Sequence, residues 1–299
     1  MIKKTTALRK AIAENDILIL PGTFNALVAR QIEEMGFEAV YCTGAGICTS
    51  YLGLPDIGLI TLTEMITVVR NIASAVRLPV ISDADTGFGN AINVIRTVRE
   101  FEAAGAASIH IEDQVSPKKC GHVAGKEVIE TDEMVGKIKA AISARQDPDF
   151  VLIARTDSKN IEGLKAAIER TKAYRDAGAD VIFPEALQSA EEFEEFAKAV
   201  PDVPLMANMT EFGKTPYFTA EEFRQMGYKI VVFPVSTMRV AMKAVEEFLI
   251  ELKKTGTQKK FVERMQTRKE LYGIVNYAQY TAWENEFLPS GGVDPLSDR

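Results

Sequence analysis

Residues 113–126, DQVSPKKCGHVAGK, bring reactive side chains together in one short span. Cys120 is one of three cysteines in the chain, and it stands two positions before His122, one of two histidines. Lys119 and His122 flank the thiol, and such neighbours can lower the pKa of a cysteine. A thiol in this setting can donate a proton to a carbanion when a bond breaks. Cys120, His122 and Lys119 are therefore the candidate catalytic residues. A plain surface loop is the alternative, although such a loop has no use for an oxidisable thiol.

Carboxylates follow several of the apolar runs. Asp83 and Asp85 follow LPVIS, Glu112 follows ASIHI, and Asp56 lies in GLPDIG. The D-x-D spacing places both aspartates on one face of an extended chain. If the four acids converge, they raise each other's pKa unless a cation is bound. Mg²⁺ prefers hard oxygen ligands and retains several waters, so the pattern predicts a magnesium site. A D-x-D pair by itself is equally compatible with a structural role.

Groups that can hold an anion follow other apolar runs. Arg155 comes directly after FVLIA, where a solvated surface charge is not expected, and its fork suits carboxylates. The small, glycine-rich turn at 43–46 can offer backbone N–H groups to an anion. Arg239 and Arg268 lie in helical stretches, where a surface ion pair is the default. A metal-bound 2-oxo or 2-hydroxy carboxylate in such a site suits bond breaking next to the carbonyl carbon.

The elements that must position these groups are short apolar runs that read as strands. There are eight, at 17–20, 39–42, 78–82, 107–111, 150–154, 180–183, 203–207 and 229–233. Helical patterns lie between them, at 25–35, 62–76, 90–104, 131–145, 162–177, 190–199 and 219–226. Four of these helices end in a glycine that suits a left-handed C-cap: Gly36, Gly105, Gly178 and Gly227.

This alternation favours a parallel sheet covered by helices, in the α/β class. Eight strands fit a closed (β/α)8 TIM-type barrel. A doubly wound open sheet is the alternative, but the turn after the first strand, PGTFNA, lacks a G-x-G-x-x-G fingerprint. We therefore expect a barrel, with the site at the C-terminal ends of its strands.

The barrel is predicted to span residues 1–255, and the chain continues beyond it. Residues 256–288 form a helical extension rich in aromatic side chains, namely Tyr272, Tyr277, Tyr280, Trp283 and Phe287. An aromatic-rich helix of this kind is expected to pack on a neighbouring subunit. Residues 289–299, PSGGVDPLSDR, predict a flexible tail.

Composition narrows the class of protein. With 299 residues and 46% hydrophobic content, the chain can bury a sizeable core. A net charge of −7 without a basic block makes nucleic acid an unexpected partner, and no apolar run has the length of a membrane span. Residues 1–16 predict an amphipathic helix rather than a secretory signal. Three cysteines form neither a disulfide framework nor a zinc pattern, which indicates a reducing, cytoplasmic compartment.

Several motifs resemble those of the isocitrate lyase and phosphoenolpyruvate mutase superfamily. KKCGH at 118–122 resembles the lyase signature, and the mutase branch lacks that cysteine. Further matches are TGAG at 43–46, LPD at 54–56, DADTGFG at 83–89, HIEDQ at 110–114, ARTD at 154–157, FPEA at 183–186, NMTEFGKTP at 208–216 and GTQKKFVERMQTRKELY at 256–272. Isocitrate lyases are much longer chains, and the last two motifs are similar to the short 2-methylisocitrate lyases.

The resemblance implies a (β/α)8 barrel, helix-swapped dimers that assemble into a homotetramer, and Mg²⁺-dependent cleavage of 2-methylisocitrate to pyruvate and succinate. Carried over by position, Asp83 and Asp85 hold Mg²⁺, with Asp56 and Glu112 nearby through water. Cys120 is the catalytic acid, with Gly121 and His122 in its closing loop. The residues implied to contact the carboxylate substrate are Thr43, Gly44, Ala45, Gly121, Arg155, Glu185, Asn208, Thr210, Arg239 and Arg268.

Two departures from the family pattern leave the substrate open. Thr43 stands where the lyases usually have Ser, and Ala45 where many have Gly. An extra methyl at each position crowds the anion site, so a smaller acid such as 2,3-dimethylmalate or oxaloacetate is an alternative substrate. From another class, a non-catalytic barrel that binds a metabolite is a further alternative, although a mere binder needs no thiol on a loop.

Overall fold

The computed structural model describes residues 2–122 and 125–288. The chain divides into two compact units, Met1–Met238 and Arg239–Arg299, which we describe separately. No helix within the described ranges is long and apolar enough to cross a membrane. The predicted flexible tail, residues 289–299, lies outside the described residues.

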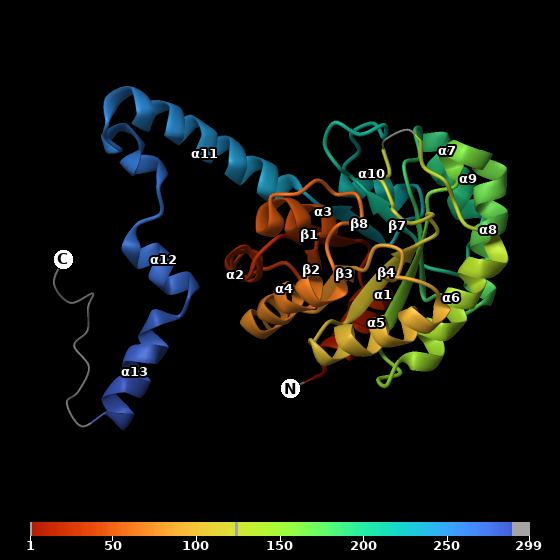
Figure 1. Cartoon of the computed structure of the whole chain (residues 1–299), viewed down its shortest axis with the longest axis horizontal. Coiled ribbons are helices and arrows are strands. Elements are labelled where there is room, and N and C mark those ends of the chain that lie inside the picture. Colours follow the sequence, from red (N-terminus) through yellow and green to blue (C-terminus); the bar gives the residue numbers. More distant parts are fainter. Residues whose placement is uncertain (1, 123–124, 289–299) are drawn as a thin grey trace. The chain divides into compact units, whose positions relative to one another are not determined.

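In the first unit, the described residues form one parallel sheet of eight strands (Figure 1). They are β1 (Leu18–Thr23), β2 (Val40–Cys42), β3 (Val80–Asp83), β4 (Ser108–Glu112), β5 (Val151–Thr156), β6 (Val181–Pro184), β7 (Met206–Asn208) and β8 (Ile230–Phe233). Neighbouring strands follow the order β6-β5-β4-β3-β2-β1-β8-β7. The two ends meet through a parallel bridge between Ile182 and Leu205. The prediction of a (β/α)8 barrel is confirmed.

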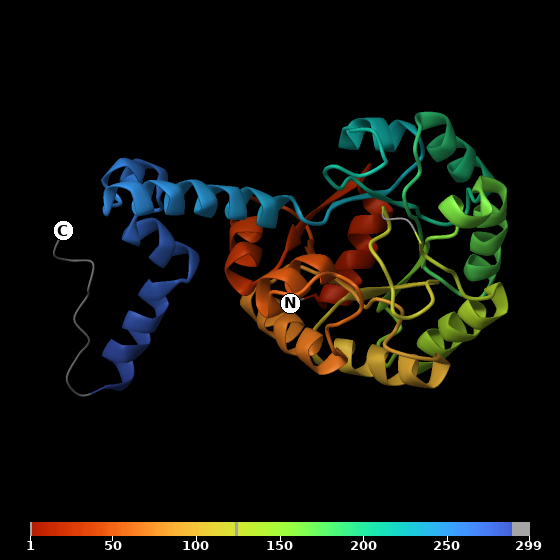
Figure 2. The ribbon, with the colours of Figure 1, turned by 45° about the horizontal axis from the view of Figure 1, so that its top comes forward.

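Helices surround this sheet (Figure 2). The seven predicted helices are confirmed within two residues: α2 (Ala26–Glu34), α4 (Leu62–Ala75), α5 (Ala91–Ala103), α6 (Thr131–Ala144), α8 (Leu164–Asp176), α9 (Ala190–Ala199) and α10 (Ala220–Gln225). The predicted C-cap glycines have positive φ angles, +81° at Gly36, +89° at Gly105, +106° at Gly178 and +94° at Gly227. Because glycine tolerates this conformation, each helix can turn sharply into the next strand.

Residues 44–52 are helical, although the sequence predicts a glycine-rich turn there. They form α3 (Gly44–Ile47) and a π-helical turn (Cys48–Leu52). Thr43 caps α3, since its Oγ1 accepts a hydrogen bond from the N–H of Gly46 at 3.1 Å. A Cβ atom on Gly44 would lie 2.4 Å from Oδ2 of Asp83. The glycine therefore permits close packing against Asp83. The short helix α7 (Lys159–Glu162) was also not predicted.

Helix α1 (Lys4–Glu14) closes the N-terminal end of the barrel interior, and it confirms the predicted first helix. Leu8 and Ile12 belong to the same buried cluster as the inward-facing side chains of the strands. Arg9 fixes the helix from outside this cluster. Its Nε donates to the carbonyl oxygen of Asp149 at 3.0 Å, and its Nη2 pairs with Asp180 at 2.9 Å.

The second unit is helical. Helix α11 (Ser236–Thr255) leads into it, followed by a 3-10 helix (Lys259–Arg264), α12 (Arg268–Ile274) and α13 (Tyr277–Phe287). The stretch predicted as a helical extension, residues 256–288, thus contains three separate helical elements. Thr267 forms a capping box that starts α12, and Asn276, with φ +55°, separates α12 from α13. The predicted boundary at residue 255 and the packing on a neighbouring subunit stay predictions.

Candidate active site

The predicted strand-end residues lie at one rim of the barrel. Asp83 ends β3, Glu112 ends β4, and Arg155 is the next-to-last residue of β5. Glu185 follows β6 directly, and Asn208 ends β7. Parallel strands of a barrel present their C-terminal ends at the same rim. Glu112 and Glu185 are each 1% exposed, so this rim holds charges that have lost most of their water.

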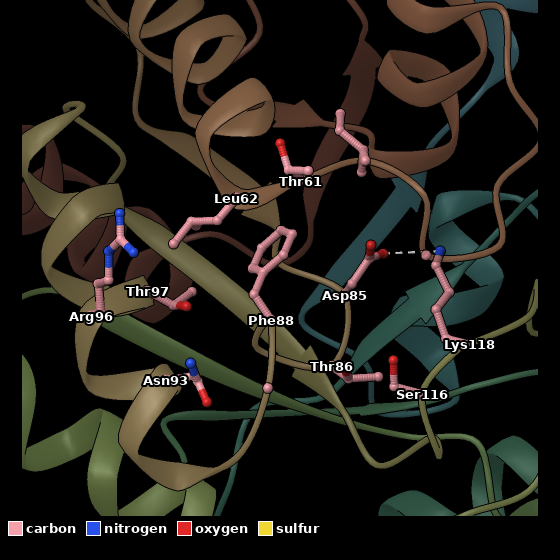
Figure 3. Close-up of a pocket in the computed structure, with 13 residues that line it drawn as sticks. Thr61, Leu62, Asp85, Thr86, Phe88, Asn93, Arg96, Thr97, Ser116 and Lys118 are labelled. Atoms are coloured by element: carbon pink, nitrogen blue, oxygen red, sulfur yellow. Dashed lines mark ion pairs between the residues drawn. The ribbon is translucent and has the colours of Figure 1, made fainter.

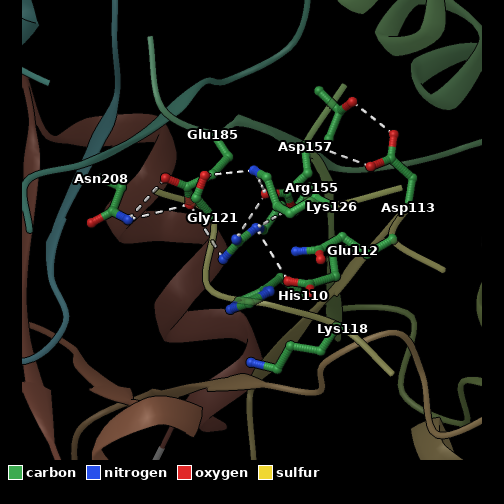
Figure 4. A network of polar contacts seen from close by, with 12 residues as sticks. His110, Glu112, Asp113, Lys118, Gly121, Lys126, Arg155, Asp157, Glu185 and Asn208 are labelled. Atoms are coloured by element: carbon green, nitrogen blue, oxygen red, sulfur yellow. Dashed lines mark hydrogen bonds and ion pairs between the residues drawn. The ribbon is translucent and has the colours of Figure 1, made fainter. Parts of the chain in front are cut away.

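Arg155 is the centre of this group (Figure 4). Its Nε lies 3.2 Å from Oε2 of Glu112 and 2.9 Å from Oδ2 of Asp157, and its Nη1 lies 3.2 Å from Oε2 of Glu185. Burial lowers the pKa of the guanidinium, but these three carboxylates raise it well above its ordinary value. Arg155 therefore stays charged, as the sequence predicts from its place after an apolar strand.

Glu185 is ionised in this surrounding. Burial alone would raise the pKa of its carboxyl, but Arg155 and His122 hold that pKa well below the usual range. Nε2 of His122 lies 3.0 Å from Oε1 of Glu185, and Nδ2 of Asn208 donates to both carboxylate oxygens at 3.2 Å. Oδ1 of Asn208 is buried and has no hydrogen-bond partner within the described residues. That oxygen is available to a donor on a bound molecule.

The loop that carries Cys120 docks on the pair Arg155–Glu185. A Cβ atom on Gly121 would lie 2.4 Å from Cγ of Glu185 and 2.7 Å from Nη2 of Arg155, so only a glycine fits this approach. Nζ of Lys126 secures the loop, since it donates to the carbonyl oxygen of Gly121 at 2.5 Å and to Asp157 at 2.7 Å. The thiol of Cys120 is free and exposed.

Lys119 lies on the outer side of the loop. Its backbone N–H donates to Oε1 of Gln114 at 2.9 Å, and its exposed ammonium contacts the carbonyl oxygen of Gly125. These contacts hold the backbone on either side of Cys120. A catalytic part for Lys119 stays a prediction.

Lys118, which was not among the predicted site residues, is the buried lysine of the loop. It is 4% exposed. Its Nζ contacts Oδ1 of Asp56 and lies 2.9 Å from Oδ1 of Asp85. Burial lowers the pKa of this ammonium, but Asp85 and its neighbouring acids raise it well above the ordinary value. The sequence places three lysines near the thiol, and nothing in their spacing distinguishes the one that points inward.

The D-x-D spacing predicts that Asp83 and Asp85 lie on one extended strand, and this prediction is wrong. Asp83 ends β3, but Asp85 has φ +47°, in the left-handed region. Its N–H donates to Oδ1 of Asp83 at 2.9 Å, which stabilises the turn. Non-glycine residues in this conformation concentrate at functional sites. Burial raises the pKa of Asp83, and it raises that of Asp85 to about 6.

The chemistry of these oxygens fits a hard cation. Oε1 of Glu112 is buried without a hydrogen-bond partner in the described part of the chain, and the buried Oδ1 of Asp85 has only its ion pair with Lys118. No three Asp, Glu, His or Cys side chains within residues 2–122 and 125–288 form a complete metal cluster as placed. Mg²⁺ is usually bound by one or two carboxylates, with waters and substrate completing its shell, so a full protein cage is not required. Ligation by Asp83, Asp85, Asp56 and Glu112 stays a prediction.

A buried pair beneath Asp83 was also missed from the sequence. The hydroxyl of Tyr41 lies 2.7 Å from Nε2 of His110, which is 3.5 Å from Oδ1 of Asp83. Burial lowers the pKa of His110 to about 3, so its ring is neutral. Burial also raises the pKa of Tyr41 well above its ordinary value, so the phenol stays protonated. The rarity of histidine in this chain was the one available signal for His110.

The remaining predicted residues fall into two groups. Thr43, Gly44 and Ala45 follow β2, and Gly44 packs against Asp83, while Thr210 follows β7 and is half-buried. Arg239 and Arg268 belong to the second unit, the former in α11 and the latter at the start of α12. A part for either arginine in the site stays a prediction.

A cavity of about 390 Å³ is lined in part by Asp85 and Lys118. Figure 3 shows Asp85 and Lys118 on one side of it and Asn93 and Arg96 of α5 on the other. This volume is within the range of small-molecule sites. The cavity gives water and small ions room directly beside the ion pair of Asp85 and Lys118.

Known proteins resemble this chain over almost its full length. The model of the phosphoenolpyruvate phosphomutase family matches residues 8–253. The chain is 55% identical to the 2-methylisocitrate lyase of Aeropyrum pernix, over 91% of this chain and 87% of that protein. It is 46% identical to the 2-methylisocitrate lyase of Escherichia coli, over 92% and 93%, and 43% identical to the 2,3-dimethylmalate lyase of Eubacterium barkeri, over 94% and 96%.

Solved structures agree with these relatives. A 2,3-dimethylmalate lyase matches with a TM-score of 0.91 and 38% identity, over 98% of this chain and 99% of the other. An oxaloacetate acetylhydrolase bound to 3,3-difluorooxalacetate matches at 0.90 and 35%, over 98% of each chain. A phosphonopyruvate hydrolase bound to oxalate and Mg²⁺ matches at 0.88 and 32%, over 96% and 100%. The chain therefore belongs to the phosphoenolpyruvate phosphomutase family, in the isocitrate lyase superfamily, and it is a carbon–carbon lyase.

Proposed function

We propose that this lyase cleaves 2-methylisocitrate to pyruvate and succinate and depends on Mg²⁺. The observation that carries the proposal is the docking of the Cys120 loop on the buried pair Arg155–Glu185, through Gly121. This docking brings the loop that carries the free thiol of Cys120 against a rim of fixed charges. The names of the relatives at 46% and 55% identity support the choice of acid.

The reaction defines what the side chains must do. The hydroxyl on the methyl-bearing carbon loses its proton, and the bond from that carbon to its carboxylate-bearing neighbour breaks. The first carbon becomes the ketone of pyruvate, and the electron pair stays on the second carbon. The thiol of Cys120 delivers a proton to that carbanion, which gives succinate. The hydroxyl proton balances the thiol proton, so reprotonation of Cys120 restores the enzyme.

Other residues bind and orient the substrate. Oδ1 of Asn208 lacks a hydrogen-bond partner among the described residues, and we propose that it accepts from the substrate hydroxyl. Arg155 keeps a positive charge at the rim that attracts the substrate carboxylates.

We propose Asp83 and Asp85, with Asp56 and Glu112 nearby, as the metal site. When bound, Mg²⁺ supplies positive charge to substrate oxygens. The backbone of 43–45 and the side chains of Thr210, Arg239 and Arg268 complete the proposed substrate contacts.

Two other acids are second candidates. Cleavage of 2,3-dimethylmalate is favoured by the 43% identical relative, and hydrolysis of oxaloacetate by the structural match at a TM-score of 0.90. A non-catalytic metabolite-binding barrel does not agree with the relatives, which are enzymes.

A substrate panel tests the proposal. Pyruvate release is measured with 2-methylisocitrate and 2,3-dimethylmalate, glyoxylate release with isocitrate, and oxalate release with oxaloacetate. We expect the highest kcat/KM with 2-methylisocitrate, loss of activity in EDTA and recovery with Mg²⁺. If 2-methylisocitrate gives no pyruvate while 2,3-dimethylmalate or isocitrate is cleaved, the assignment of the substrate is wrong and the lyase class stands.

We also propose a cytoplasmic homotetramer built from helix-swapped dimers. Five apolar side chains of α11 are between 44% and 71% exposed: Val240, Met242, Val245, Leu249 and Ile250. Such a surface is typical of an interface. The three free cysteines suit a reducing compartment. Light scattering on the full chain should give the tetramer mass, and Leu249→Glu should lower it, whereas Lys243→Glu, on an exposed side chain, should not.

A further inference from the structure

His122 is held between two partners, one on each ring nitrogen. The backbone N–H of Lys214 donates to Nδ1 at 3.0 Å, and Nε2 lies 3.0 Å from Oε1 of Glu185. A backbone N–H can only donate, so Nδ1 must be the acceptor. The proton of the neutral ring is then on Nε2, which lies 3.0 Å from Oε1 of Glu185 but without hydrogen-bond geometry in the described residues. The tautomer of His122 is thus set by a residue 92 positions away in the chain.

Gly213 makes this contact possible. A Cβ atom on Gly213 would lie 2.8 Å from Nδ1 and 2.9 Å from Cε1 of His122, and 3.1 Å from Cγ2 of Thr210. Its φ angle is not in the left-handed region, so the backbone itself would accept an alanine. The need for glycine at this position is therefore steric, and the group that would be pushed aside is the imidazole.

The segment around Gly213 is anchored to the stretch that carries Glu185. Oγ1 of Thr215, which is buried, donates to the carbonyl oxygen of Leu187 at 2.7 Å. Leu187 lies two residues after Glu185. The donor to Nδ1 and the carboxylate that faces Nε2 therefore come from two chain segments that this hydrogen bond joins.

We infer that Gly213 and the backbone N–H of Lys214 are a positioning element, which fixes the tautomer and orientation of His122 so that its Nε2–H faces Glu185. The inference rests on the proposed function, in which His122 belongs to the catalytic loop. Cys120 lies two residues before His122, so we expect a displaced imidazole to disturb the position of the thiol. If the ring carried protons on both nitrogens, its Nδ1–H and the N–H of Lys214 would be two donors facing each other, which is unfavourable.

The chain has only two histidines, so imidazole nitrogen NMR can read the tautomer directly. The full-length protein is labelled with ¹⁵N-histidine, and His122→Gln assigns the signals. In the wild type we expect His122 with an unprotonated Nδ1 and a protonated Nε2. A protonated Nδ1 on His122 overturns the inference without any variant.

Gly213→Ala is the decisive variant. We expect mixed tautomers at His122, an unchanged spectrum for His110, and a kcat lower by about 100-fold with KM little changed, because misplacement by about 1 Å has that effect. Gly136→Ala is the matched control, since a Cβ atom there meets nothing within 4 Å. An unaltered His122 spectrum and unaltered kcat in Gly213→Ala overturn the inference. If the wild type cleaves no acid of the panel while Gly213→Ala still mixes the tautomers, the proposed function fails and the positioning of His122 stands.

Discussion

The Nζ atom of Lys118 lies 2.9 Å from Oδ1 of Asp85, and it also contacts Asp56. One ammonium thus stabilises two carboxylates in the place where the sequence predicts a metal. The lysine is in the same loop as Cys120, two positions before it. The side chain of Lys118 therefore links the charges of Asp56 and Asp85 to the position of the loop that carries Cys120.

Replacing Lys118 should destabilise the fold most when no metal is present. Lys118→Met leaves two carboxylates without their cation, and removing one partner of a buried pair costs about 3 kcal/mol in the free energy of unfolding. Urea unfolding in EDTA measures this loss, and Mg²⁺ should recover part of it. Lys119→Met, which alters the exposed neighbour, should change the free energy of unfolding by less than about 0.5 kcal/mol. Equal effects of the two variants would contradict this view of Lys118.

Cys120→Ser should fold normally, still bind Mg²⁺ and lose turnover. A serine hydroxyl is a much weaker acid than a thiol, and general acid catalysis contributes about 10²- to 10⁴-fold to a rate. Single-turnover pyruvate release measures the effect. Cys48→Ser is the control, because the Cys48 thiol donates to the carbonyl oxygen of Pro55 at 3.3 Å and a serine can keep that bond. Activity retained in Cys120→Ser would remove the cysteine from the acid role.

Thr43 should tolerate serine but not valine. Its hydroxyl caps α3, and a Cβ atom on Gly46 would lie 2.3 Å from its methyl group, so that methyl faces Gly46. Thr43→Ser keeps the cap, and we expect kcat/KM within about threefold of the wild type. Thr43→Val keeps the shape and loses the cap, which costs about 1 kcal/mol of stability. Thermal unfolding and the substrate panel measure both. A large gain for a bulkier acid in Thr43→Ser would show that the methyl limits the site.

The stabilising effect of Glu185 should depend on pH. Its folded-state pKa lies well below the ordinary value of 4.5, because Arg155 and His122 outweigh burial. A lowered pKa contributes stability that is fully present above the unfolded pKa and is lost as the pH falls through the folded pKa. Glu185→Gln should therefore cost about 3 kcal/mol at pH 7, and this difference should narrow below pH of about 4.5. Urea unfolding at several pH values tests this. A difference that grows toward low pH would contradict it.

The strands and outer helices could be predicted because their causes are local. Parallel strands buried on both faces are continuous apolar runs, and a helix that must turn into the next strand ends in a glycine. The four C-cap glycines illustrate the second rule, since all have positive φ angles. The helix at 44–47 could not be predicted, because Gly44 and Gly46 serve packing against Asp83 and Thr43, which sequence spacing does not reveal.

The site was predictable in its residue types but less so in its partners. Cys120, Arg155 and Glu185 stood out by type and by their place after strands. Lys118 and Lys126 did not, because burial of a lysine depends on acids far away in the sequence. Lys126, for example, pairs with Asp157, 31 positions later. Similarly, the break at Asn276 depends on one left-handed residue that the aromatic pattern around it conceals.

The place of α1 at the closed end of the barrel has a consequence for how the chain folds during synthesis. This helix is synthesised before the residues that it contacts, since Arg9 pairs with Asp149 and Asp180, and Thr5 with Asp147. These partners are 140 or more positions later in the chain. The helix must therefore wait, with Leu8 and Ile12 uncovered, until most of the barrel has been translated. Contacts of such long sequence separation slow folding, and they leave the apolar face of α1 exposed for longer than the local contacts of the outer helices would.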